Sequence, residues 1–132
     1  MIEEAYVSKE VAELLLEKGF DEPCHFYYKK GIHTPYLNDF GGLRITNSEY
    51  KKAKVDKVSA PTQQMAMRWL REVYDIDIII KCVWQDGLFP YSFKITSHNP
   101  HKIIRNPEIT VFFNHYEETV NYAIKYCCEK LI

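Results

Sequence analysis

The segment SAPTQQMAMRWLREVYDIDIIIKCVWQDGLFPYSFKIT, which runs from Ser59 to Thr96, decides the fold class of this chain. Its first third predicts an amphipathic helix, because apolar residues recur at the three- and four-residue intervals of one helix face. Ser59 can cap this helix, and Pro61 is tolerated in the first turn, where its missing N–H has no partner to lose. The predicted buried stripe consists of Met65, Ala66, Trp69, Leu70 and Val73.

The helix leads directly into a predicted β-hairpin. Residues 76–84 and 88–96 place large apolar side chains at alternate positions, as strands do when one face is buried. Asp86-Gly87 lies between them and is typical of a tight turn, since glycine accepts a positive φ. The two strands and the preceding helix therefore share one predicted apolar face.

The register of the hairpin follows from that apolar face, because a shift of one residue would invert one strand. Pro90 has no N–H to donate, which favours a four-residue loop over residues 85–88 and puts the Pro90 end of its strand at a sheet edge. The opposite face carries Ile79 and Val83, so we expect a helix or another subunit to cover part of it. The predicted facing pairs are Trp84 with Phe89, Cys82 with Tyr91, Ile80 with Phe93, and Ile78 with Ile95.

The N-terminal part of the chain predicts one more helix and a strand. Ser8 and Gly19 bracket a helix over residues 8–18, as an N-cap and the residue after the C-cap. Residues 24–30 alternate as a strand does, and residues 31–58 are the least regular part. Within them, turns are expected at Gly41-Gly42 and Thr46-Asn47-Ser48, with short strands over 36–40 and 43–45.

The C-terminal part predicts a short strand over residues 109–113 and a third helix that ends near Lys130. Asn114 and Glu117 have the spacing of a capping box at its start. The element order α-β-(β)-α-β-β-α predicts a single α+β domain over residues 1–132, with three helices and a small antiparallel sheet of three to five strands. Helices on both sides of that sheet would make an α/β/α sandwich.

Composition excludes several classes of protein. The formal net charge of −1 gives no general attraction to nucleic acid or to an anionic membrane. No apolar run reaches the roughly 20 residues of a membrane span, and the start Met-Ile-Glu-Glu lacks the features of a signal peptide. Four cysteines without a CxxC pair are expected to be buried thiols in a reducing compartment, which favours the cytoplasm: Cys24, Cys82, Cys127 and Cys128.

Motifs that carry chemistry are missing from the sequence. It contains no Gly-rich phosphate loop, no GxSxG and no HExxH, so no catalytic residue and no cofactor is predicted. His98 and His101 have a possible metal-ligand spacing, but Pro100 argues against a helix there, and a surface loop without metal is expected. Cys24 and His25 are neighbours on a strand and point to opposite faces, so they cannot form a nucleophile pair.

Charge is distributed unevenly along the chain. Residues 44–57 hold five positive and two negative residues, whereas the first 22 residues hold seven acids and two bases. Such asymmetry can steer one subunit toward another or toward a polyanion, although a solvated loop is the simpler interpretation. The candidate nucleic-acid-binding residues are Lys51, Lys52, Lys54 and Lys57, and the aromatic residues that could stack on bases if exposed are Tyr27, Tyr28, Tyr36 and Phe40.

Arg68 and Arg71 lie three residues apart in the helix that follows Ser59, with Glu72 and Asp75 nearby. Opposite charges three or four residues apart on a helix form exposed ion pairs. We therefore expect these four residues to form ion pairs on the exposed surface of the helix.

Three segments resemble small uncharacterised proteins of prophages and mobile elements of gut Bacteroidales. They are Ser59-Ala-Pro-Thr-Gln-Gln with Arg68-Trp-Leu-Arg-Glu-Val-Tyr74, the start from Val11 through Lys18-Gly-Phe20 to Cys24, and the tail Phe113-Asn-His-Tyr-Glu-Glu-Thr with Ala123-Ile124. The architecture is also similar to that of phage α/β/α sandwich domains. The resemblance implies kinship and brings no catalytic residue.

The leading hypothesis is a non-enzymatic accessory protein, derived from a phage or mobile element, that acts through protein contacts as a homodimer or with a phage or host protein. It rests on the missing catalytic motifs, the unpaired sheet edge and an aromatic content of 14%, because aromatic residues are enriched at interfaces. The alternative is a weak single-stranded nucleic-acid-binding protein that uses residues 44–57.

Overall fold

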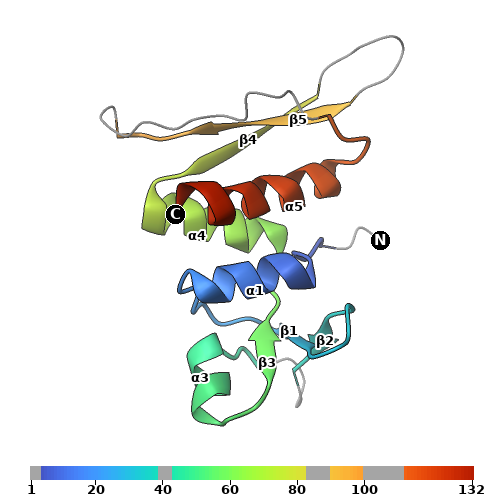
Figure 1. The fold of residues 1–132 in the computed structure, drawn as a ribbon, viewed down its shortest axis with the longest axis vertical. Coiled ribbons are helices and arrows are strands. Elements are labelled where there is room, and N and C mark those ends of the chain that lie inside the picture. The colour runs from blue at the N-terminus through green and yellow to red at the C-terminus, as the bar shows by residue number, and fades with distance from the viewer. Residues whose placement is uncertain (1–3, 39–42, 83–89, 100–111) are drawn as a thin grey trace. The chain divides into compact units, whose positions relative to one another are not determined.

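The computed structural model describes residues 4–38, 43–82, 90–99 and 112–132, and the chain divides into two compact units, residues 1–65 and 66–132. The described residues form two antiparallel sheets with helices packed on them, so the α+β class is confirmed (Figure 1). The elements are α1 (Lys9–Glu17), β1 (Phe26–Lys29), β2 (Tyr36–Leu37), α3 (Asn47–Lys52), β3 (Lys57–Ser59), α4 (Gln63–Tyr74), β4 (Asp77–Cys82), β5 (Tyr91–Thr96), α5 (Tyr116–Tyr126) and a π-helical turn, η1 (Cys127–Leu131).

Helix α1 forms where the sequence predicts it. The Ser8 hydroxyl accepts a hydrogen bond from the Val11 N–H at 3.3 Å, and Gly19 ends the helix with a φ of +93°. A left-handed residue after the last turn is a common helix stop, and glycine adopts it without strain. The buried side of α1 consists of Val11, Ala12 and Leu15.

Strand β1 is the central strand of the first unit, and β2 and β3 pair with it on either side. The register sets Tyr27 opposite both Tyr36 and Ser59, Tyr28 opposite Val58, and Lys29 opposite Lys57. Because neighbouring strand residues point to opposite faces, Tyr27 and Tyr28 face different helices. The Tyr27 ring meets the ring of Tyr50 in α3, whereas the Tyr28 hydroxyl donates to the Val7 carbonyl, just before α1.

Two elements of the first unit are corrections to the sequence interpretation. Thr46 and Ser48 do not mark an isolated turn, because Thr46 caps α3 in a reciprocal capping box with Glu49. Ser59 does not cap a helix but lies in β3. The helix instead begins at Gln63, where the Thr62 hydroxyl accepts from the Met65 N–H at 3.1 Å.

Buried amides hold the irregular segment of the first unit together. Asn47 is 5% exposed, donates to the Phe20 carbonyl at 2.9 Å and accepts from the Ser59 N–H at 2.9 Å. Asn38 donates to the Cys24 carbonyl and accepts from the Tyr50 hydroxyl at 2.5 Å. These bonds join α3 to β3, to the segment before β1 and to the residue after β2 through polar groups, which explains why apolar periodicity is weak in this part of the sequence.

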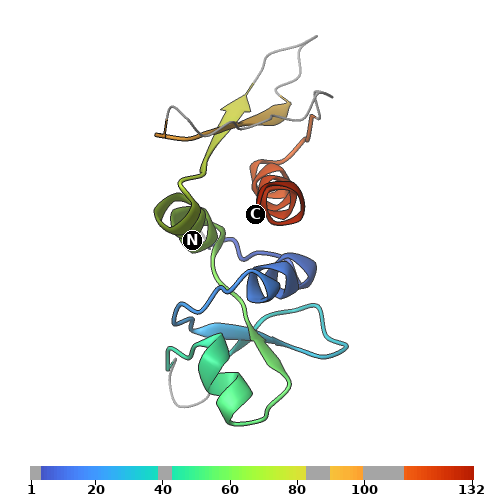
Figure 2. The same cartoon turned by 60° about the vertical axis from the view of Figure 1, so that its left-hand side comes forward.

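The second unit contains the predicted hairpin. Ile78 pairs with Ile95, Ile80 with Phe93, and Cys82 with Tyr91, so the predicted register is confirmed for the described pairs. The pair Trp84–Phe89 and the loop over residues 85–88 lie outside the described residues. Figures 1 and 2 show α4 and α5 on the same side of the β4–β5 ribbon.

The two faces of the β4–β5 ribbon differ in burial. Phe93 and Ile95 are buried, and the Phe93 ring contacts the rings of Tyr122 and Tyr126 in α5. Ile79 points to the other face and is 44% exposed. We expected a helix or another subunit to cover that face. Among the described residues, no helix covers it at Ile79.

The start of α5 departs by one residue from the expected capping box. His115 occupies the N-cap and makes no side-chain capping hydrogen bond, so Asn114 is not the cap. The Thr119 hydroxyl instead donates to the His115 carbonyl at 2.8 Å and ties the first turn together. Of the predicted strand 109–113, residue Phe113 pairs with Tyr91 in a single antiparallel bridge, and residues 109–111 lie outside the described residues.

Candidate functional site

The candidate site is a surface of the first unit that we name the basic tyrosine face, made of Tyr27, Lys29, Tyr36 and Lys57. The rings of Tyr27 and Tyr36 are stacked with centroids 6.0 Å apart. The Lys57 ammonium lies 4.3 Å from the Tyr27 ring centroid, and the Lys29 ammonium lies 5.7 Å from that of Tyr36. Two cations therefore sit over one pair of stacked rings.

This arrangement places two like charges directly across a strand pair. Lys29 is the register partner of Lys57, and like charges directly opposite each other destabilise a sheet. The two tyrosine rings reduce that cost, because the face of an aromatic ring attracts a cation. Lys29 is exposed and Lys57 is half-buried, so both ammonium groups can reach a bound anion.

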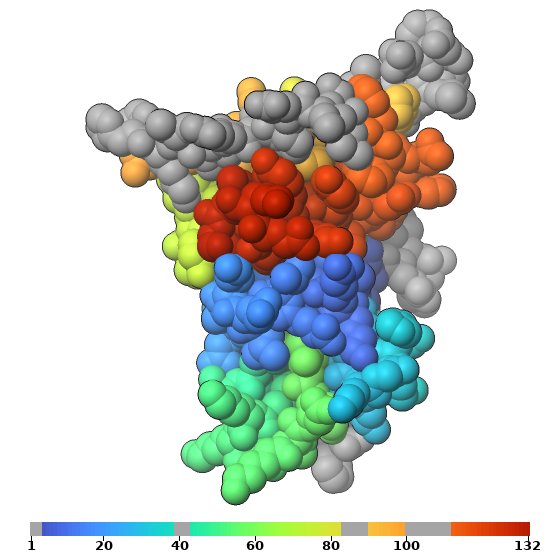
Figure 3. All heavy atoms as spheres, in the orientation of Figure 1, coloured from blue at the N-terminus to red at the C-terminus, as the bar shows by residue number. Residues whose placement is uncertain are grey.

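Three exposed lysines lie in α3 or just after it and are called the α3 lysines: Lys51, Lys52 and Lys54. Lys51 and Lys52 lie in the last turn of α3, where a positive charge complements the helix dipole. Lys54 follows the helix with a φ of +58°, a left-handed conformation that glycine adopts more easily. Figure 3 shows α3 and β2 on the same drawn side of the first unit, separated by the segment that contains β3.

The predicted stacking residues divide into two kinds. Tyr36 is 43% exposed and is available for stacking on a base. Tyr27 and Tyr28 are 5% and 3% exposed, so the interpretation of these two rings as stacking platforms is wrong. Phe40 lies outside the described residues.

Two open clefts lie beside α1 in the first unit. Tyr28 and Val58 line the smaller one, which therefore lies on the face of the sheet opposite the Tyr27 ring. The smaller has a volume of about 290 Å³ and is lined by residues that include Lys9, Glu13, Lys29 and Asp56. The larger has a volume of about 420 Å³ and shares Lys9 and Glu13 with the first. Lys29 thus belongs both to the basic tyrosine face and to the wall of a cleft. Patterns along the sequence do not predict the smaller cleft, because residues of α1, of β1 and of the segment leading into β3 form it.

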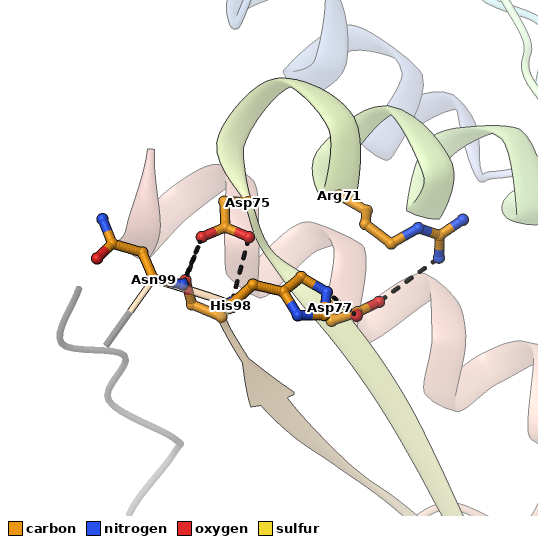
Figure 4. A network of polar contacts seen from close by, with 6 residues as sticks. Arg71, Asp75, Asp77, His98 and Asn99 are labelled. Atoms are coloured by element: carbon orange, nitrogen blue, oxygen red, sulfur yellow. Dashed lines mark hydrogen bonds and ion pairs between the residues drawn. The ribbon is translucent and has the colours of Figure 1, made fainter. Parts of the chain in front are cut away.

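A separate polar network closes the corner between α4 and β4 in the second unit (Figure 4). The carboxylate of Asp75 accepts hydrogen bonds from the Ser97 hydroxyl at 2.5 Å and from the backbone N–H groups of His98 and Asn99 at 3.2 and 3.0 Å. Asp75 has a φ of +56°, which the side-chain bonds help to hold. The network ties the end of β5 to the helix–strand corner and is structural.

The expected ion pairs of α4 form with one change of partner. Arg68 pairs with Glu72 at 2.9 Å, as the spacing predicts. Arg71 contacts Asp77 at 3.5 Å, and the same carboxylate lies 3.4 Å from the His98 imidazole. Asp75 is thus used by the corner network and Asp77 by Arg71.

Asp75 makes the stability of the second unit depend on pH. The Ser97 hydroxyl, opposed by desolvation and assisted by the two N–H groups, lowers the pKa of Asp75 below its ordinary value of 3.8. A lowered pKa stabilises the folded state above the unfolded-state pKa, and this contribution disappears as pH falls through the folded-state pKa. We expect Asp75→Asn to unfold at a lower urea concentration than the parent at pH 6, with the difference shrinking below pH 3.8. A difference that stays constant between pH 6 and strongly acidic pH would contradict this.

The positions of the cysteines and of His25 do not support a nucleophilic site. Burial raises the pKa of Cys24 to about 12, so its thiol stays protonated and weakly nucleophilic near neutral pH. His25 is exposed while Cys24 is buried, as the strand alternation predicts. Cys127 and Cys128 are buried as expected, but Cys82 is exposed, which corrects the expectation for that residue. None of the four cysteines is part of a disulfide.

The histidine pair is only half described. His98 is exposed, and His101 lies outside the described residues. Among the residues that the structure describes, no group of three or more His, Cys, Asp or Glu side chains could hold a metal ion.

The comparisons with known proteins add no family. No protein-family model matches the chain, and neither the curated proteins nor the solved structures provide a match. Within the described ranges, no helix combines the length and the apolar content needed to cross a bilayer.

Proposed function

We propose that this chain is a non-enzymatic binding protein whose basic tyrosine face and α3 lysines hold a single-stranded nucleic acid. The observation that carries the proposal is the cross-strand pair Lys29–Lys57, with both ammonium groups over stacked tyrosine rings. A sheet gains nothing from facing two lysines with each other, whereas phosphate groups would bridge them.

The proposed division of work follows ordinary single-strand recognition. The lysines contact phosphates, which gives affinity without sequence preference and makes binding fall as salt rises. Tyr36 supplies an exposed ring on which a base can stack. The net charge of −1 for the whole chain does not prevent this, because the charge is segregated along it.

The test is binding of a fluorescein-labelled 12-residue oligodeoxythymidine, followed by anisotropy at low and moderate salt. Reversing Lys51, Lys52 and Lys54 to glutamate should weaken binding at low salt by about tenfold or more. It should also reduce the slope of log affinity against log salt by about 2, which is roughly 0.7 for each lost phosphate contact.

A matched control uses three exposed lysines of the second unit, Lys81, Lys94 and Lys130. Reversing them changes the net charge by the same amount but leaves the first unit intact. We expect this variant to bind almost as the parent does. Equal loss in both triple variants would reduce the effect to net charge, and no binding by the parent at low salt would remove the proposal.

A homodimer is the second candidate, and it is favoured by charge complementarity within the first unit. Helix α1 carries exposed Glu10, Glu13 and Glu17, which could lie against the lysines of a second copy. Light scattering of the parent and both triple variants separates the candidates. A dimer that dissociates only when the α3 lysines are reversed, in protein that binds no oligonucleotide, would favour self-association.

The origin of the chain is a further part of the proposal. We propose that it belongs with small proteins of Bacteroidales prophages and mobile elements, on the sequence segments given above. Nucleic-acid binding is compatible with such an origin, and so is contact with a phage or host protein in the cytoplasm.

A further inference from the structure

The outer edge of strand β4 is a feature of the second unit that the proposed function does not use. Strand β5 pairs with one side of β4, and among the described residues no strand pairs with the other side. The Tyr91 N–H and carbonyl both bond to Phe113, at 2.7 and 2.8 Å, so they point away from β4. Tyr91 is the register partner of Cys82, and this pair therefore exchanges no hydrogen bonds across the ribbon.

The alternation of an antiparallel ladder then directs backbone groups to the outer edge of β4. Hydrogen-bonded and non-hydrogen-bonded pairs alternate along two antiparallel strands. The pairs that Ile78 and Ile80 make with β5 are therefore also non-hydrogen-bonded. Their N–H and carbonyl groups point outward, and no hydrogen bond from a described residue reaches them. These four groups can pair with a further strand.

The side chains of β4 suit a second copy of the same strand. Asp77, Ile79 and Lys81 lie on the face of the ribbon away from α5, and Ile79 is 44% exposed. The order acid, apolar, base is complementary to itself when two copies run antiparallel. When Ile79 faces Ile79 of the second copy, each Asp77 faces a Lys81, and opposite charges at facing positions stabilise a strand pair.

The backbone and the side chains select the same register. Ile78 of one copy then faces Ile80 of the other, so the four outward groups of each copy are all paired. Ile79 occupies a non-hydrogen-bonded pair, in which facing side chains are closest. A shift of two residues in either direction would set Ile79 against Asp77 or Lys81 of the second copy.

We infer that β4 pairs antiparallel with β4 of a second copy, about a two-fold axis at Ile79. Such a contact uses the same patch on both copies and joins the two β4–β5 ribbons into one sheet. Asp77 contacts Arg71 at 3.5 Å and His98 at 3.4 Å in its own chain, and a carboxylate can accept further bonds from a lysine. This surface is separate from the charges of α1 and α3.

A disulfide trap tests the position of the axis. Residues that face each other in a non-hydrogen-bonded pair have Cα atoms about 4.5 Å apart, within the range of a disulfide. In a Cys82→Ser background, Ile79→Cys should therefore form a covalent dimer with oxidised glutathione, visible on a non-reducing gel. Lys94→Cys in the same background is the matched control, because Lys94 is the exposed β5 partner of Ile79 and lies one strand further from the axis. It should remain monomeric.

Sedimentation equilibrium measures the association without a cross-link. One strand pair is smaller than a standard protein interface, so we expect a weak dimer that is populated at about 0.1 mM. Lys81→Glu should weaken it by roughly tenfold or more, because two attractive pairs become repulsive. Lys94→Glu makes the same change of charge in the same ribbon and should leave the association unchanged.

Three outcomes would overturn the inference. The first is a parent protein that is monomeric at about 1 mM, where even a weak interface of this kind would be occupied. The second is equal cross-linking through Ile79→Cys and Lys94→Cys. The third is a dimer that survives Lys81→Glu but dissociates when the α3 lysines are reversed, which would assign self-association to the first unit. Oligonucleotide binding is measured separately by anisotropy, so each of these results leaves the proposed nucleic-acid binding to its own test.

Discussion

Replacing Ile95 by alanine is expected to lower the free energy of unfolding by about 2–5 kcal/mol, the usual cost of truncating a buried isoleucine. Ile95 is 2% exposed and faces Ile78 across the β4–β5 ribbon. The variant would lose the favourable free energy of moving the removed methyl and methylene groups from water into the core. The cavity that alanine leaves would add to the cost. Urea unfolding followed by circular dichroism measures it.

Ile79→Ala is the matched control for Ile95→Ala. Ile79 lies in the same ribbon but on the other face, where it is 44% exposed. We expect it to cost about 0.5 kcal/mol or less, as surface substitutions usually do. A larger cost at Ile79 than at Ile95 would mean that the ribbon is paired one residue out of the described register.

Asn47→Ala is expected to lower the free energy of unfolding by about 2–5 kcal/mol, because two buried backbone groups lose their partners at once. The Phe20 carbonyl would lose its donor and the Ser59 N–H its acceptor. These groups belong to different parts of the first unit, so the cost should appear in its cooperative unfolding. A urea titration measures the free energy of unfolding. As a local readout, the Ser59 amide hydrogen should exchange with solvent faster in the variant than in the parent.

Ser48→Ala is the control for the Asn47 substitution. Its hydroxyl bonds to Asp21 at 2.6 Å, but at an exposed position next to Asn47 in the same helix. We expect it to cost about 1 kcal/mol or less, since water replaces the lost partner. If Ser48→Ala were as costly as Asn47→Ala, the burial of the Asn47 amide would not be the cause.

The hairpin shows what sequence periodicity can establish. Its register could be predicted because a slip of one residue would expose Phe93 and Ile95 together, so burial of one face selects a single pairing. The start of α1 was equally accessible, since Ser8 and Gly19 act through local backbone chemistry. The bounds of α1 depend on residues that are neighbours in the chain, and the hairpin register depends on the strict alternation of buried and exposed side chains.

The first unit shows why the remainder was harder. Thr46 and Glu49 were in fact the signal for α3, but their short helix has few apolar positions, and the turn residues around it concealed the capping box. The side chain of Ser59 can cap a helix and so predicts a helix start, whereas pairing with Tyr27 places Ser59 in a strand. Long-range pairing outweighed local preference there.

The candidate site was foreseen in part for the same reason. The α3 lysines and Lys57 are clustered in the sequence, so charge counting found them. Lys29 lies 28 positions from Lys57 in number and joins it only through the register of β1 with β3. Neither the burial of Tyr27 nor the shared role of Lys29 in a cleft is visible before the strands are paired.

The facing lysines of β1 and β3 make occupancy and folding of the first unit two aspects of one equilibrium. Whatever anion relieves the repulsion between Lys29 and Lys57 binds the native chain better than the unfolded one, and mass action then raises the melting temperature as its concentration grows. A thermal-shift screen of anions therefore ranks ligands for this surface without any label. The anions that bind best should raise the melting temperature of the first unit most.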